Sequence, residues 1–145
     1  MATEIPGWVK RMETEFAGGP GRGAYCLAIV AGGSGVVNMA MTRNASHLIS
    51  GLGLAGILGV GGYMVADSYA VEDDDALSSA LHFTIGASTV STAVAGGMAI
   101  LSLRRGSKPA ASLLALLAGL SLSSSFYHML IMDRMGFRSH DPPSS

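Results

Sequence analysis

Four long stretches of the chain carry no charged side chain, and the charges are confined to the short segments between them and to the two ends. The stretches contain 20, 23, 28 and 24 residues. A helix needs about 20 apolar residues to cross the hydrocarbon core of a bilayer, and it satisfies its own backbone hydrogen bonds, as lipid requires. The pattern therefore predicts an all-α integral membrane bundle of four transmembrane helices. The expected spans are about 23–42, 45–66, 77–103 and 109–132.

The third stretch differs from the others because its first half is polar. It contains His82 and a run of serine and threonine residues between Ser78 and Thr92. We expect this helix to pack inside the bundle, unless one of the spans lies partly in the membrane interface.

The segment 1–22 precedes the first span and has a different pattern. Trp8, Met12 and Phe16 recur every four residues, while charged residues fall between them. This spacing predicts a short amphipathic helix that anchors the chain at the membrane surface, followed by a Gly/Pro hinge. A tail without fixed structure is the alternative. The polar tail 133–145 closes the chain.

Composition agrees with a bilayer protein and excludes other classes. Only 13% of residues are charged, 49% are hydrophobic, and the net charge is -1. A soluble helical bundle would need a polar face for water, and four charge-free stretches leave none. The chain has no basic stripe that could follow nucleic acid. Cys26 is the single cysteine, so no internal disulfide forms.

Small residues recur four positions apart in every span and predict close helix packing. Lipid provides no hydrophobic drive between helices, so close backbone approach has to supply the contact. The contacts can lie within the chain or with other subunits. The packing positions that we expect are Gly32, Gly51, Ala55, Gly59, Ser91, Ala95 and Gly119. Asn38, inside the first span, is expected to hydrogen-bond across helices.

Two histidines are the candidate ligand-binding residues. His82 and His128 lie on adjacent spans at similar distances from the charged boundary. Ionisable residues inside a membrane are rare and often functional, so the pair would suit a haem iron or a ligand carboxylate. The alternative is that both reach the interface or bond a neighbouring helix. His47, at the opposite boundary, is expected at the interface.

Five of the nine Lys and Arg residues lie on the side of the two chain ends, and four gather in the turns on the opposite side of the membrane. These four are Arg43, Arg104, Arg105 and Lys108. Such a cluster favours the cytosolic or matrix face and would hold anionic head groups, with bound phospholipid or cardiolipin plausible. The loop Asp67–Asp75 on the other side is acidic, but its spacing matches no calcium site.

No catalytic motif appears in the sequence. It has no serine-centred elbow, no metalloprotease motif, and no phosphate-binding loop that ends in lysine. We therefore expect no enzymatic activity, no metal centre and no cofactor, apart from the haem considered above.

The segment from Tyr25 to Tyr63 resembles the TMEM14 family of small organellar membrane proteins. It combines a glycine-rich first helix with a second helix of the form Leu-x-x-Gly-Leu that ends in Gly-x-Tyr; the matching residues are Leu48, Gly51, Leu52, Gly59, Gly61 and Tyr63. The basic turn after Leu103, Pro109 and Ala118–Leu122 extend the resemblance to about residues 23–130. Ser46 stands where the family often has proline, and the last helix carries an extra turn. The acidic loop, the N-terminal segment and the tail are additions.

The resemblance implies the mitochondrial inner membrane, or the plastid envelope for the fatty-acid-export branch. It also implies transport of hydrophobic carboxylates such as fatty acids or porphyrin precursors. The additions favour a different function, a non-catalytic accessory subunit of a large membrane complex such as those of the respiratory chain, with lipids and other membrane subunits as partners. A haem-binding subunit that uses His82 and His128 is a third hypothesis.

Overall fold

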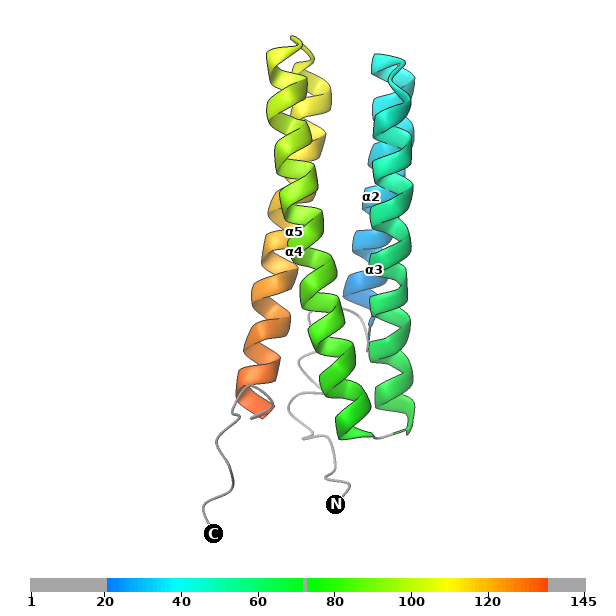
Figure 1. Ribbon diagram of the computed structural model, residues 1–145, viewed down its shortest axis with the longest axis vertical. Helices are drawn as coiled ribbons and strands as arrows, with labels where there is room; N and C mark the ends of the chain where they lie inside the picture. Colours follow the sequence, from blue (N-terminus) through cyan, green and yellow to red (C-terminus); the bar gives the residue numbers. More distant parts are fainter. Residues whose placement is uncertain (1–20, 72, 136–145) are drawn as a thin grey trace.

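The computed structural model describes residues 21–71 and 73–135, and these are almost entirely helical (Figure 1). Four helices follow one another in an up-and-down order. They are α2 (Arg22–Thr42), α3 (Ala45–Val71), α4 (Asp74–Arg104) and α5 (Lys108–Met135). Each is long and apolar enough to cross a bilayer. The described part of the chain thus confirms the all-α membrane bundle, and the third helix is long and apolar enough to span a bilayer like the others. The predicted amphipathic helix with Trp8, Met12 and Phe16 lies outside the described residues.

The helices extend past some of the predicted boundaries. α3 continues to Val71, five residues beyond the predicted end, and α4 begins at Asp74. The acidic loop is therefore much shorter than the predicted segment Asp67–Asp75. The Asp73 side chain caps α4 by accepting hydrogen bonds from the backbone N–H groups of Asp75 and Ala76, at 3.0 and 3.1 Å.

The other two connections, at the opposite end of the bundle, are tight turns. Arg43 adopts a left-handed conformation (φ 56°), and its N–H bonds the Met39 carbonyl. After α4, Gly106 has φ 82°, its N–H bonds the Leu103 carbonyl, and the Ser107 N–H bonds the Ser102 carbonyl. This pair of bonds satisfies the last carbonyls of the helix, and glycine meets the positive φ without strain. We call this the basic end, because Arg43, Arg104, Arg105 and Lys108 are all exposed there.

The chain forms two hairpins, α2–α3 and α4–α5, which stand side by side (Figure 1). α3 also packs on α4, whereas α2 touches α5 only sparsely. The bundle is therefore closed along the α3–α4 side and more open along the α2–α5 side.

Backbone contact holds the first hairpin together. A Cβ added to Gly51 would lie 2.6 Å from the Cα of Gly35 and 2.8 Å from the carbonyl oxygen of Ala31, so no larger residue fits. Hydroxyl pairs join the second hairpin instead. The Oγ atoms of Ser91 and Ser121 are 2.7 Å apart and fully buried.

Two apolar clusters form the core. One surrounds Leu58 and Leu117 in the middle of the bundle, and the other surrounds Leu81 and Ile131 near the end where α2 begins and α5 ends. The buried side chains toward the basic end include polar ones, Asn38, His47 and Ser102. This distribution leaves a polar region between the hairpins at the basic end.

Candidate functional site

His128 is buried in α5 beside the open side of the bundle. Its Nδ1 donates a hydrogen bond to the Ser124 carbonyl at 2.8 Å, and its ring meets the Tyr127 ring edge-on at 5.3 Å between centroids. In a neutral ring this bond leaves Nε2 as an acceptor. His128 lines a cavity of about 300 Å³ between α2 and α5, whose walls are mostly apolar and include Leu27 and Val30. We call this cavity the α2–α5 groove.

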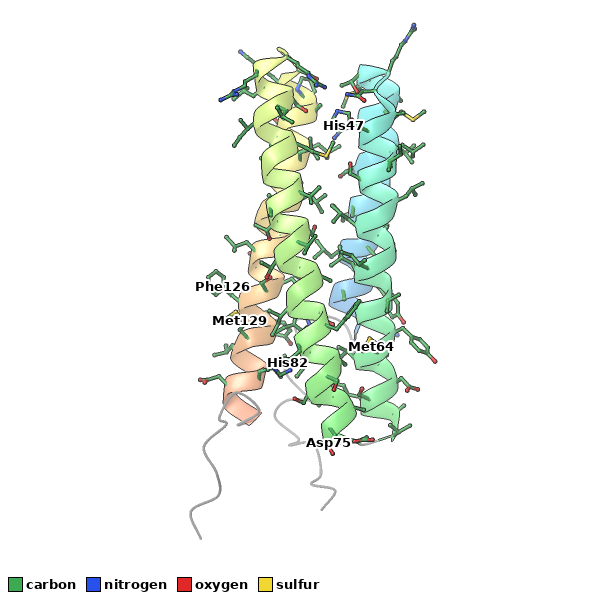
Figure 2. All side chains as sticks on the ribbon, in the orientation of Figure 1. His47, Met64, Asp75, His82, Phe126 and Met129 are labelled. Carbon is green, nitrogen blue, oxygen red and sulfur yellow. The ribbon has the colours of Figure 1, made fainter. Side chains whose placement is uncertain are left out.

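His82 lies on an exposed part of α4 and faces a different space. Its Nδ1 is 2.7 Å from the Ser78 carbonyl oxygen. It lines a cavity of about 190 Å³ with Ile85, Met129 and Met132, on the α4–α5 side of the bundle (Figure 2). His82 and His128 thus line separate cavities, and the structure does not bring them together as one ligand site.

Some of the predicted packing positions lie at helix contacts and others do not. Gly51 and Ala95 are buried, and Ser91 bonds across the second hairpin. A Cβ at Gly32 would touch the Ala55 side chain at 3.5 Å, an ordinary contact between α2 and α3.

Gly59 and Gly119 do not mediate contacts within the described chain. A Cβ at either position would meet no atom within 4 Å. The sequence left open whether such contacts lie within the chain or with other subunits, and at these two positions the described residues supply none. Spacing identifies a stripe of small residues, but it does not distinguish a stripe that faces a neighbouring helix from one that faces outward.

Asn38 was predicted to bond across helices, and the structure contradicts this. Its side chain is fully buried, and neither Nδ2 nor Oδ1 makes a hydrogen bond to any described residue. Leaving both groups unpaired is costly, so this side chain needs a partner that the described residues do not supply.

His47 was expected at the interface, but it is 5% exposed and lies between the two hairpins (Figure 2). Its Nδ1 has no hydrogen-bond partner among the described residues. Asn38 and His47 line the same small void, of about 10 Å³, which can hold about one water molecule. His47 also lines two larger cavities that reach Arg105.

The sequence contains a signal for this arrangement in the spacing of Asn38 and His47 from the contacting glycines. Asn38 lies three residues after Gly35, and His47 lies four residues before Gly51. Residues three or four apart share a helix face. The two polar side chains therefore lie on the faces that the contacting glycines define.

Of the basic residues, Arg105 lines both larger cavities, whereas Arg104 lines neither. Arg43, Arg104 and Lys108 are exposed at the same end. No cluster of three or more histidine, cysteine or acidic residues that could hold a metal ion occurs in residues 21–71 and 73–135.

The fold and these sites together define a four-helix membrane protein with two paired hairpins, a lateral apolar groove and a polar region at its basic end. Comparisons of the chain with protein-family models, with curated proteins and with solved structures found no match.

Proposed function

We propose that this protein is a non-catalytic subunit of a larger membrane assembly. The observation that carries the proposal is a set of small residues that point away from the bundle. On α5, Ala115, Gly119 and Ser123 follow one another at four-residue spacing and are all exposed. On α4, Gly86, Ala93 and Gly97 form a second exposed face.

The glycines of these two faces have no packing role among the described residues. A Cβ at Gly86, Gly97 or Gly119 would meet open space, in contrast to the contact between Gly35 and Gly51. Exposed glycine lowers helix propensity and brings no contact with lipid in return. Small residues at four-residue spacing let a second helix approach closely, so a partner helix explains their presence on an outer face.

The assembly that we propose lies in an organellar membrane, with the mitochondrial inner membrane as the first choice and the plastid envelope as the alternative. The resemblance to the TMEM14 family supports this placement. The acidic loop and the two terminal segments offer further partner contacts outside the bilayer.

Native electrophoresis of gently solubilised organelle membranes, with immunodetection of this chain, tests the proposal. Migration with a complex of much larger mass is expected. Migration as a small species without partners would refute the subunit role.

Transport of a hydrophobic carboxylate is the second candidate, and the α2–α5 groove favours it. The groove is open at its side, mostly apolar, and contains His128 as a polar group. An acyl chain would lie against Leu27 and Val30, while the imidazole of His128 would meet the carboxylate. Flux of a labelled fatty acid into proteoliposomes that contain the purified chain tests this function.

A haem-binding role has less support. A bis-histidine site requires both imidazoles to reach one iron, and His82 and His128 line separate cavities. An absorption spectrum of the purified protein in oxidised and reduced form tests the role directly.

A further inference from the structure

We propose that the polar region between the two hairpins at the basic end binds the phosphate of an anionic phospholipid. The residues that form the site are Arg105 at its mouth, His47 in its wall and Asn38 at its base. The inference requires no partner subunit, so it can fail or succeed independently of the proposed function.

The mouth of the site is a polar cavity of about 270 Å³ between the turns of the two hairpins. Its walls include Asn44, His47, Ser102, Arg105 and Ser107. These side chains offer several hydrogen-bond donors and one fixed positive charge, with no carboxylate among the lining residues. An arginine can bind a phosphate through two parallel hydrogen bonds, and hydroxyl groups can donate to the remaining oxygens. The chemistry therefore suits an anion with several acceptor oxygens.

The base of the site supplies an independent observation. Asn38 is completely buried with both side-chain polar atoms unpartnered, and the Nδ1 of His47 is buried and unpartnered as well. Both residues line the small void beneath the mouth, together with Ser34 and Ser50. Buried polar groups without partners inside a protein normally contact a ligand or an ordered water. One water in this void would connect Asn38 to the imidazole that faces the bound anion.

A side opening of the site points to a lipid as the source of the phosphate. His47 and Arg105 also line a cavity of about 240 Å³ between α3 and α4, whose wall includes Met98 and Leu101. Leu101 is 49% exposed, so it faces the surroundings of the bundle. An acyl chain can leave the site along this apolar wall while the phosphate stays beside Arg105. Soluble phosphate has no acyl chain that could lie along this wall.

The location agrees with the same ligand. Arg43, Arg104 and Lys108 are exposed around the mouth at this end of the membrane spans. Exposed cations next to a membrane surface attract anionic lipids. They would concentrate such lipids near the mouth, whereas Arg105, His47 and Asn38 would select the head group.

The test uses the full chain, purified in a neutral detergent and freed of lipid. Thermal unfolding is followed while phosphatidylglycerol, phosphatidylcholine with the same acyl chains, or inorganic phosphate is added. Phosphatidylglycerol is expected to raise the unfolding temperature at concentrations where the other two do not. Arg105→Gln is expected to weaken the affinity for phosphatidylglycerol about tenfold, because a charge-assisted hydrogen bond is lost.

Arg104→Gln is the matched control, since it removes the same charge one residue away without touching either cavity. It should retain most of the affinity. His47→Leu changes the wall of the site with little change in volume and should weaken binding as Arg105→Gln does.

Three results would overturn the proposal. Equal stabilisation by phosphatidylcholine would mean that the head-group charge does not matter. Equal losses of affinity in Arg104→Gln and Arg105→Gln would mean that surface charge alone attracts the lipid. An Arg105-dependent shift of the same size with inorganic phosphate would assign the site to a soluble anion instead of a lipid.

Discussion

Gly35 and Gly51 face each other where α2 crosses α3, so close that a Cβ on Gly51 would lie 2.6 Å from the Cα of Gly35. The nearest atoms belong to backbone and cannot rotate away. The register of the first hairpin therefore depends on two residues without side chains. The second hairpin uses hydroxyl pairs between α4 and α5 instead, of which the pair Ser91 and Ser121 is fully buried. The first hairpin is thus held by backbone contact at two glycines, and the second by hydrogen bonds between hydroxyl groups.

Gly51→Ala should destabilise the protein by about 1–3 kcal/mol, since the new methyl group forces the helices apart. Thermal unfolding in detergent, followed by circular dichroism, measures the effect. Gly53→Ala is the control on the same helix, because a Cβ there meets no atom within 4 Å. It should leave stability unchanged or raise it slightly through helix propensity. Equal effects of the two substitutions on stability would contradict the close contact of α2 and α3 at Gly51.

Ser91 and Ser121 should be energetically coupled. A hydroxyl–hydroxyl bond inside a membrane protein contributes about 0.6 kcal/mol on average, and at most about 1.7 kcal/mol. Each alanine substitution leaves the other buried hydroxyl unpaired, so Ser91→Ala with Ser121→Ala should cost less than the sum of the two. A double-mutant cycle measures this coupling. The control cycle pairs Ser91 with the exposed Ser112 and should be additive. Additivity in both cycles would argue against the bond.

The four spans were predictable because the absence of charge over about 20 residues is a local property of the sequence. The ends of the helices were not. A charged residue such as Asp67 marks where the hydrocarbon core stops, but the backbone helix can continue into the aqueous phase. α3 continues past Asp67 as far as Val71, so the exposed Asp67 lies within the helix and does not end it.

The polar region at the basic end was harder to predict than the helices. Spacing identifies the faces that carry Asn38 and His47, but not which faces of different helices meet. The same limit explains Gly119, which belongs to a stripe of small residues and yet points outward. Contacts between helices depend on the whole bundle, whereas periodicity describes one helix at a time.

Gly119→Leu should release the protein from the proposed assembly without unfolding it. The leucine side chain would project from the outer face of α5, where a Cβ meets no described atom within 4 Å, and would block close approach of a partner helix. Native electrophoresis should show the variant as a smaller species, while thermal unfolding of the purified chain stays near that of the wild type. Ile49→Phe, an exposed apolar exchange on α3, is the control and should still co-migrate. Normal co-migration of Gly119→Leu would exclude this face as the subunit contact.

If the chain transports a hydrophobic carboxylate, His128 and His82 should differ sharply in their effect on flux. His128 is 3% exposed in the α2–α5 groove, whereas His82 is exposed on α4 and lines another cavity. His128→Ala should therefore lower the flux of a labelled fatty acid into proteoliposomes about tenfold, since the imidazole is the polar group facing the carboxylate in the groove. His82→Ala removes the same imidazole group from α4 and should leave flux within about twofold of the wild type.

His128→Gln keeps a hydrogen-bond donor at the same position. It should restore part of the flux if that contact, and not the packing of α5, is what matters. Equal losses in both alanine variants would remove the α2–α5 groove as the transport path, and unchanged flux in both would argue against carboxylate transport through either histidine.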